Sequence, residues 1–343
     1  MFGRDRKPIR IRVFGKTDLG RTRDHNEDRF LVADLTRRDA SLQPPVRDHV
    51  VGERGSLLVV ADGMGGAAAG EVASAMATDT IYARLVDVWG NDAETSAQRF
   101  AYWLKDAVEA ANAEIHAYAK AHPDVRGMGT TTTAVGVLGD HVFLSQVGDS
   151  RAYLVRNGVA HQLTKDQSLM QRLVEAGEIT EEEAAHSERR NIILQALGPD
   201  AKVKVDLTYQ ELRKGDALVL CSDGLSGQVR KEEIGRIVSS TPDPSGACDQ
   251  LIALANERGG PDNITVVVAR FDGDGLQISD VEAEIGHQVY PLIDTETNTE
   301  PVPIYKGSKP PQPAKRKRWR AVIAVLVAAG LVGLGLYLFT RGS

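Results

Sequence analysis

The sequence predicts an α+β domain with a C-terminal transmembrane helix, and three kinds of pattern support this. Apolar runs of strand length recur through the first part of the chain, for example at 57–61 and 217–222. Two long segments, 70–89 and 95–121, have apolar residues at helical spacing. Residues 321–339 contain no charged side chain, which is typical of a membrane span.

Turn residues and periodicity give the order of the elements. Residues 9–14 and 29–34 look like strands on either side of a polar connection, and the charged residues 35–55 have no period, so we expect a surface loop there. Gly139-Asp140 and Asn157-Gly158 each join two strand-like runs, and both predict a β-hairpin. The first long helix carries one face formed by Val72, Met76, Thr80 and Ala83. The remaining predicted elements are helices at 231–239 and 245–258 and a last strand at 263–271.

Two segments do not fit the series of strands. Residues 166–198 are helical and acidic, with a capping box from Thr180 to Glu183, and they interrupt the strands like a lid. We expect the folded domain, residues 1–272, to end with the last strand. Residues 273–320 are first acidic, then proline-rich and finally basic, which predicts a linker.

The apolar segment 321–339 predicts an anchor in the lipid bilayer. A helix of this length, at about 1.5 Å per residue, nearly matches a hydrocarbon core of about 30 Å. Basic residues lie at 315–318 and Arg320, whereas Arg341 is the only charged residue after the segment. The positive-inside rule therefore predicts a single-pass membrane protein whose large N-terminal part is cytoplasmic.

Composition argues against several partners and sites. The hydrophobic content of 42% and the charged content of 26% are ordinary for a globular chain. A net charge of -6 argues against nucleic acid as the main partner, since binding to phosphate backbones calls for a basic face. The two cysteines, Cys221 and Cys248, give no disulfide framework and show no metal-ligand spacing.

Four aspartates stand beside strand-like apolar runs, at Asp62, Asp149, Asp223 and Asp262. Each one alone is weak evidence, because aspartate is common in turns and caps. Together they are stronger, because a charge at the end of a buried strand is unfavourable without a partner, and a hard cation is the simplest partner. The set therefore predicts an oxygen-rich metal site.

Such a site suggests phosphoryl chemistry. Two divalent cations held by carboxylates bind a phosphoryl group and lower the pKa of a shared water, so that hydroxide attacks phosphorus. Oxygen ligands favour Mg²⁺ or Mn²⁺ over zinc, and none of the eight histidines lies in an HExxH pattern. An arginine near the metals would clamp the phosphate, and Arg23 is the candidate.

Six short motifs follow one another between about residues 9 and 272. They are Arg23-x-x-Asn26-Glu27-Asp28, Asp62-Gly63-Met64-Gly65-Gly66, Gly129-Thr130-Thr131, Gly148-Asp149-Ser150-Arg151, Ser222-Asp223-Gly224-Leu225 and Gly260-Pro261-Asp262-Asn263. Their order and spacing resemble the motifs of the metal-dependent, type 2C protein serine/threonine phosphatases, and the DGMGG form resembles the bacterial branch. The resemblance implies a four-layer α/β/β/α sandwich with a central antiparallel β-sandwich and a metal site at one end.

The resemblance also implies a role for each metal-site residue. Asp62 would bridge two Mn²⁺ or Mg²⁺ ions, and the carbonyl of Gly63 would bind one of them. Asp223 and Asp262 would hold the first ion. Glu27 would reach the second ion through water.

Other residues take their expected roles from the same resemblance. Arg23 would bind the substrate phosphate, Asp149 would help to hold a third, weaker metal, and 166–198 would be the family's flap. Animal members have a histidine where this chain has Met64, so the proton donor to the leaving alcohol stays open between solvent on the metals and His25. The residues expected to orient the ligand loops are Ser150, Arg151 and Asn263.

The predicted function is metal-dependent hydrolysis of phosphoserine and phosphothreonine in proteins, counteracting a serine/threonine kinase at the membrane. A cysteine-based phosphatase needs an arginine six residues after its cysteine, where this chain has Gly227 and Leu254. Gly15-Lys16-Thr17 resembles the end of a P-loop, but Arg10 replaces its first glycine. The alternative is a membrane-anchored scaffold that binds phosphoproteins without catalysis.

Overall fold

The computed structural model describes residues 7–40, 47–65, 69–187, 189–278 and 284–292. They belong to one compact unit, Met1–Ile293. No helix within these ranges is long and apolar enough to cross a membrane. The expected transmembrane helix at 321–339 and most of the expected linker at 273–320 lie outside the described residues, so both stay predictions.

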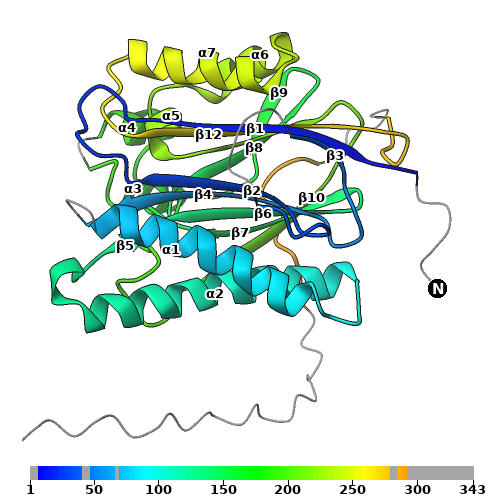
Figure 1. Cartoon of the computed structure of the whole chain (residues 1–343). Helices are drawn as coiled ribbons and strands as arrows, with labels where there is room; N and C mark the ends of the chain where they lie inside the picture. The colour runs from blue at the N-terminus through cyan, green and yellow to red at the C-terminus, as the bar shows by residue number, and fades with distance from the viewer. Residues whose placement is uncertain (1–6, 41–46, 66–68, 188, 279–283, 293–343) are drawn as a thin grey trace, which may run out of the picture. The chain divides into compact units, whose positions relative to one another are not determined.

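Two antiparallel sheets lie face to face between two layers of helices (Figure 1), which confirms the expected four-layer α/β/β/α sandwich. The first sheet has the order β3 (Arg47–Val50), β1 (Arg10–Asp18), β12 (Ile264–Asp272), β11 (Ala217–Cys221), β8 (Arg151–Arg156) and β9 (Val159–Gln162). The second sheet has the order β10 (Asp206–Glu211), β7 (His141–Val147), β6 (Thr132–Leu138), β4 (Ser56–Met64) and β2 (Asp28–Asp34), and the short β5 (Gly129–Thr130) pairs with β4.

Helices cover the outer face of each sheet. The second sheet packs against α1 (Ala69–Arg84), a π-helical turn (Leu85–Trp89) and α2 (Ala97–Ala121), and the first packs against α6 (Lys231–Ser240) and α7 (Pro244–Glu257). The shorter helices are a 3-10 turn (Pro123–Val125), α3 (Leu169–Glu175), α4 (Glu181–His186) and α5 (Asp223–Ser226).

Strand β4 shows why its sequence is an unbroken apolar run. Leu58 and Val60 face the core between the two sheets, whereas Leu57 and Val59 face the core under α1 and α2. Successive side chains of a strand point to opposite faces, and here both faces are buried. By the same alternation, the even-numbered residues of β4 face the space between the sheets. Asp62, at the end of the strand, is one of them.

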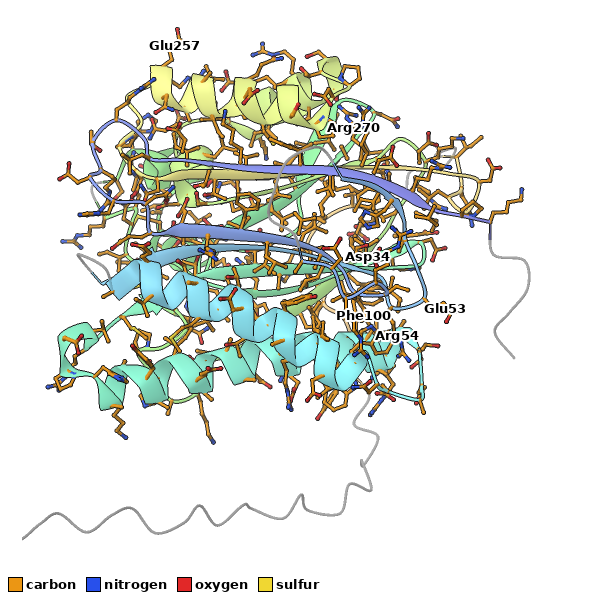
Figure 2. All side chains as sticks on the ribbon, viewed as in Figure 1. Asp34, Glu53, Arg54, Phe100, Glu257 and Arg270 are labelled. Atoms are coloured by element: carbon orange, nitrogen blue, oxygen red, sulfur yellow. The ribbon has the colours of Figure 1, made fainter. Side chains whose placement is uncertain are left out.

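Phe100 anchors α2 on the second sheet (Figure 2). Its side chain is fully buried and its ring centroid lies 5.7 Å from that of Phe143 in an edge-on arrangement. A Cβ atom built at Gly136 would lie 2.3 Å from the ring, so only glycine leaves room for Phe100 on strand β6.

The buried face of α1 differs from the face named from the sequence. Its buried residues include Ala73, Ala77 and Ile81, whereas Ala83 is exposed. Small side chains let the helix approach β4 closely. In a helix this rich in alanine, the larger side chains do not mark the side that packs.

Both predicted hairpins are confirmed, by the pairing of β6 with β7 and of β8 with β9. Asn157 and Gly158 have φ values of 52° and 84°, the left-handed conformation that this kind of turn requires. Two strands were missed. Residues 47–50, expected in a loop, form β3 on the edge beside β1, and β10 has no counterpart in the prediction.

The domain does not end at residue 272 as expected. Residues after β12 return to the free edge of β10, where the amide of Tyr209 donates to the carbonyl of Gln288 (3.0 Å) and the amide of Tyr290 donates to that of Leu207 (2.9 Å). The ring of Tyr290 packs edge-on against Phe143, with centroids 5.2 Å apart. The compact unit accordingly extends to Ile293, because an exposed strand edge gains hydrogen bonds when the chain covers it.

Candidate metal centre

The polar cluster lies where the core between the sheets ends. Asp62 on β4 and Asp28 on β2 are direct partners in an antiparallel pair. Both continue the rows of residues that face the other sheet, since Val60 and Val32 belong to the core between the sheets. Ser222 and Thr265 continue the corresponding rows of β11 and β12.

Neutral side chains hold the backbone of Asp62. Its amide donates to Oγ1 of Thr131 (3.2 Å), and its carbonyl accepts from the amide of Thr131 (2.8 Å) and from Oγ1 of Thr130 (2.9 Å). Oγ of Ser150 lies 2.7 Å from Oγ1 of Thr131 and joins this strand to the loop of Asp149. The Gly-Thr-Thr motif therefore positions the central carboxylate without touching a charged atom.

Glu27 and Gly63 lie together at the start of α1. The amide of Gly63 donates to the carbonyl of Glu27 (3.1 Å). A Cβ atom built at Gly70 would lie 2.7 Å from the carboxyl carbon of Glu27, so Gly70 leaves room for that carboxylate beside the positive end of the helix. Close backbone packing here requires glycine at both positions.

Asp223 follows β11 and is fixed through its neighbour. Oγ of Ser222 donates to Oδ2 of the buried Asp28 (2.7 Å) and accepts from the amide of Thr265 (3.0 Å). Burial raises the pKa values of Asp62 and Asp223, and Asp223 lies close enough to Asp62 and Asp262 for repulsion among the carboxylates to add to this. The ends of β2, β4, β11 and β12 therefore meet at one place.

Asn263 ties Asp262 to the loop before β2. Its Oδ1 accepts from the amide of Glu27 (2.8 Å), and its Nδ2 donates to the carbonyls of Leu19 and His25 (3.0 Å each). Nη2 of Arg23, from the same loop, donates to Oδ2 of Asp262 (2.7 Å). Arg23, the residue expected to bind the substrate phosphate, thus lies at the edge of the carboxylate cluster, with its side chain 49% exposed.

Asp149 and the flap are joined through Arg151. Its Nη2 and Nε donate to the carboxylate of Asp166 at 2.7 and 2.9 Å, and Asp166 stands where the expected flap begins. The amide of Gln167 donates to the carbonyl of Gly148, the residue before Asp149 (2.9 Å). Within the flap, the capping box from Thr180 to Glu183 is confirmed.

The carboxylates strongly disfavour one another's charge. Burial raises the pKa of Asp62 well above its usual range, and repulsion from the neighbouring aspartates, Asp28 first, adds to this. Burial also raises the pKa values of Asp28 and Asp149 to about 7 and that of Asp223 in the same direction. A bound cation would favour the charged form of these carboxylates, so the cluster is suited to binding a cation.

The donor set fits hard cations that keep part of their water shell. One carboxylate oxygen each of Asp28, Asp149 and Asp223 is buried and has no hydrogen-bond partner in the part of the chain that the structure describes. Among the described residues, no three Asp, Glu, His or Cys side chains converge closely enough to hold an ion by themselves. Further oxygen ligands must therefore come from water or from a backbone carbonyl such as that of Gly63, which suits Mg²⁺ or Mn²⁺.

Hydrogen bonds or charge repulsion connect the seven residues named from the sequence, with Arg23 at the edge and Asp149 beside the flap, and their roles as metal ligands stay predictions. The structure adds Asp28, Gly70 and Thr131, which had no assigned role. Asp28 and Thr131 lay inside recognised motifs, whereas Gly70 gave no signal beyond a helix start. The expected supporting role of Asn263 agrees with its hydrogen bonds.

A model of the protein phosphatase 2C family matches residues 31–254 of this chain. The serine/threonine phosphatase Stp of Listeria monocytogenes is 40% identical over 258 residues, which are 75% of this chain and 94% of that protein. The chain belongs to the protein phosphatase 2C family. Like the relatives that carry that name, it is a protein serine/threonine phosphatase.

Solved structures of other members have the same fold. The serine/threonine phosphatase of S. agalactiae matches with a TM-score of 0.66 and 34% identity, over 76% of this chain and 98% of that one. The catalytic domain of the phosphatase PstP, in a complex with two manganese ions, matches with a TM-score of 0.62 and 38% identity, over 77% of this chain and 99% of that one. The family expected from the six motifs is thus confirmed.

Proposed function

We propose that this phosphatase hydrolyses phosphoserine and phosphothreonine in proteins with two Mn²⁺ or Mg²⁺ ions, and that it opposes a serine/threonine kinase at a membrane. One observation carries the metal dependence: several aspartates with raised pKa values share one buried place, and an arginine lies at its edge. Such a cluster is unfavourable by itself and becomes favourable around divalent cations.

Specific residues would hold the ions. Asp62, Asp223 and Asp262 would turn toward one ion and share it with water, and Asp62, the Gly63 carbonyl and, through water, Glu27 would bind the other. Asp149 would help to hold a third ion more weakly. When bound, the ions would neutralise the phosphate and polarise the attacking water.

The protein's own contribution is orientation. Asn263 holds Asp262 and the Glu27 loop together, so the carboxylates from distant parts of the chain keep their places. Arg23 offers its guanidinium to the phosphate from the rim, while its bond to Asp262 fixes the direction of the side chain. An arginine in this place orients the phosphoryl group for in-line attack.

The leaving alcohol needs a proton from a group other than Met64, whose thioether carries none. Met64 is 36% exposed beside Asp62, and His25 lies on the exposed loop whose backbone Asn263 holds. If His25 is the donor, His25→Gln lowers kcat for a phosphothreonine peptide. If solvent is the donor, the variant keeps the kcat of the parent.

The metal dependence can be tested with the full chain and a phosphothreonine peptide. We expect release of phosphate with Mn²⁺ or Mg²⁺, none with EDTA, and a loss of at least about 100-fold in Asp62→Asn. Asp79→Asn, on the exposed side of α1, is the matched control and keeps full activity. Activity that survives both EDTA and Asp62→Asn contradicts the proposal.

The membrane location rests on the uncharged segment 321–339 and the basic residues before it. We expect the full chain in the membrane fraction and a chain ending at residue 314 in the soluble fraction. If both forms fractionate together, the anchor is wrong, and the proposal of membrane-borne substrates and an opposing kinase there loses its support.

The alternative of a silent scaffold predicts phosphopeptide binding without turnover. It has little support, because each carboxylate that the chemistry requires is present and the carboxylates lie together. A binding assay beside the release assay separates the two: a scaffold retains the phosphopeptide unchanged in the presence of Mn²⁺.

A further inference from the structure

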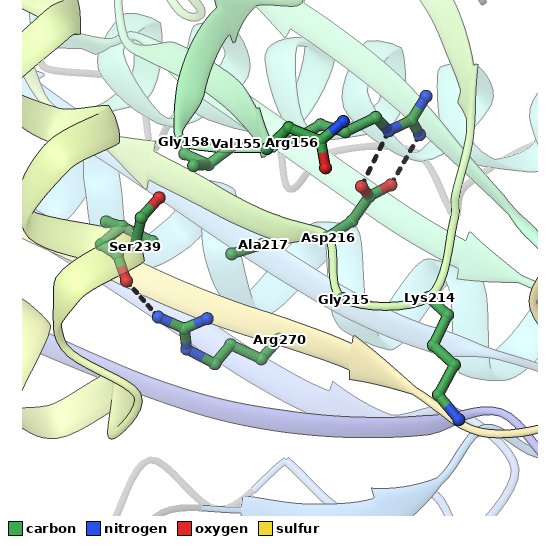
Figure 3. A pocket seen from close by; sticks show the side chains of 11 residues that line it. Val155, Arg156, Gly158, Lys214, Gly215, Asp216, Ala217, Ser239 and Arg270 are labelled. Carbon is green, nitrogen blue, oxygen red and sulfur yellow. Dashed lines mark hydrogen bonds and ion pairs between the residues drawn. The ribbon is translucent and has the colours of Figure 1, made fainter. Parts of the chain in front are cut away.

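A small pocket opens at the end of the first sheet that lies away from the metal centre (Figure 3). Strand β8 leaves the centre at Arg151 and reaches the pocket at Arg156, which at about 3.3 Å per residue is roughly 17 Å away. The pocket has a volume of about 250 Å³. Its lining includes Val155, Arg156, Lys214, Asp216, Ser239 and Arg270.

One pair of lining charges is already neutralised. Nε and Nη2 of Arg156 donate to the two carboxylate oxygens of Asp216 at 2.8 and 2.6 Å, as Figure 3 shows, and Nη2 also donates to the carbonyl of Glu211 (2.9 Å). Both side chains are almost completely buried. This pair forms a rigid wall and leaves little charge for a ligand.

Arg270 has no such partner. Its Nη2 donates to the carbonyls of Val238 and Thr241 at the end of α6, the latter at 2.7 Å. No carboxylate among the described residues lies within ion-pair distance of its guanidinium, and its Nε finds no acceptor there. Burial and repulsion from Arg12 lower the pKa of Arg270 and outweigh the attraction of Asp243, so a further anion nearby would stabilise its charge.

Lys214 adds a second charge at the rim. Its Nζ lies 3.4 Å from Asp272, with 43% of the side chain exposed, so this ion pair is weak and readily rearranged. The lining presents Arg156, Lys214 and Arg270 together with the carboxylate of Asp216, and Asp272 beside Lys214 offsets part of the remaining positive charge. A cavity with this excess of positive charge attracts anions.

We propose that this pocket binds a small organic dianion, with one acidic group at Arg270 and the other toward Lys214 on the opposite side of the pocket. The volume suits a molecule smaller than the usual occupants of ligand pockets, which fill about 300–1,000 Å³. Guanidinium and ammonium groups recognise carboxylates and phosphates through charge-assisted hydrogen bonds. The site is separate from the metal centre, and its ligand need not be a substrate or a product.

Succinate is a suitable probe, because it carries two carboxylates and fits the size, and succinamide is its uncharged counterpart. Hydrogen exchange of the intact, metal-free chain is followed by mass spectrometry at constant ionic strength. We expect succinate to slow exchange saturably at 155–158 and 214–217, with a dissociation constant in the millimolar range. Succinamide has no effect.

Variants assign the effect to the pocket. Arg270→Gln weakens binding about tenfold, and Lys214→Gln weakens it about threefold. Because Arg270 also bonds the end of α6, the exposed Lys214 provides the variant that cannot fail through misfolding. Lys120→Gln, which removes an equal charge from α2, leaves binding unchanged.

Three results overturn the proposal. The first is no saturable protection at tens of millimolar succinate. The second is equal protection by succinamide. The third is binding that Lys214→Gln and Arg270→Gln leave unaltered, which places the anion elsewhere on the protein.

Discussion

Replacing Asp62 by asparagine is expected to stabilise the metal-free protein while it abolishes activity. Asp62 lies beside Asp28 and within reach of Asp223, and each of the three has a raised pKa. An asparagine of nearly the same shape removes one charge from this group and keeps the backbone hydrogen bonds of the site. Function and stability therefore oppose each other at this position.

The sign of the pH dependence follows from the pKa values. Burial raises the pKa values of Asp28 and Asp149 from 3.8 to about 7. A carboxyl group with a higher pKa in the folded chain than in the unfolded chain stabilises the fold while protonated. The stabilisation that such a carboxyl group gives to the fold is complete below about pH 4 and is lost as the pH rises through about 7. The metal-free protein therefore becomes less stable between about pH 4 and pH 7.

The magnitude can be worked from the same values. A pKa rise of about 3 corresponds to about 4 kcal/mol for an isolated group. These carboxylates share their repulsion, so we assign about half of that, about 2 kcal/mol, to the removal of one charge. For a domain of this size, 2 kcal/mol raises the midpoint of thermal unfolding by roughly 4–8 °C.

Thermal unfolding of the metal-free full chain at pH 7.5 and pH 5 provides the test. We expect Asp62→Asn to unfold at a higher temperature than the parent at pH 7.5, with a smaller difference at pH 5, and Asp79→Asn to match the parent. Added Mn²⁺ should stabilise the parent by about 2.7 kcal/mol at 100 times its dissociation constant, and the variant much less. A metal-free Asp62→Asn protein that unfolds below the parent at pH 7.5 refutes the reasoning.

Three further outcomes follow from the contacts. Arg23→Gln should raise the KM for a phosphopeptide about tenfold in steady-state kinetics, and Arg23→Lys less, because a bidentate contact to phosphate is lost. Asn263→Ala should weaken Mn²⁺ binding by about 10–100-fold in calorimetry, since its amide orients ligand loops, and an unchanged affinity would contradict that role. Tyr290→Ala should lower the free energy of unfolding by about 1–2 kcal/mol in denaturant titrations, because its packing on Phe143 and Tyr209 is lost. No change would mean that residues 284–292 do not stabilise the domain.

Much of the site could be predicted because chemistry and strand ends coincide in the sequence. Asp62 follows an apolar run that is buried on both faces, and the alternation of side chains carries it to the end of the core between the sheets. Asp223 and Asp262 stand at the matching ends of β11 and β12. The hairpin at Asn157-Gly158 was predictable for a local reason, its left-handed turn.

Other features depend on contacts between distant segments and leave no local signal. Strand β10 has few apolar residues of its own. It forms because β7 on one side and residues 284–292 on the other pair with its backbone. Gly70 looks like any glycine at a helix start until Glu27 packs against it. Apart from Ile81, the buried face of α1 consists of small side chains, which hydrophobicity alone does not distinguish from its other faces.

The motif residues that carry no charge explain how the charged ones stay together. Repulsion would drive Asp28, Asp62 and Asp223 apart, yet Ser222 bonds one of them and the backbone contacts of Thr131 hold another. Each of these neutral groups joins strands that are far apart in the chain, so the geometry is set by folding before any cation binds. The carboxylates can then exchange their mutual repulsion for attraction to the ions by turning their side chains on a fixed backbone, and that fixed backbone is what the recurrent serines, threonines and asparagine of the motifs provide.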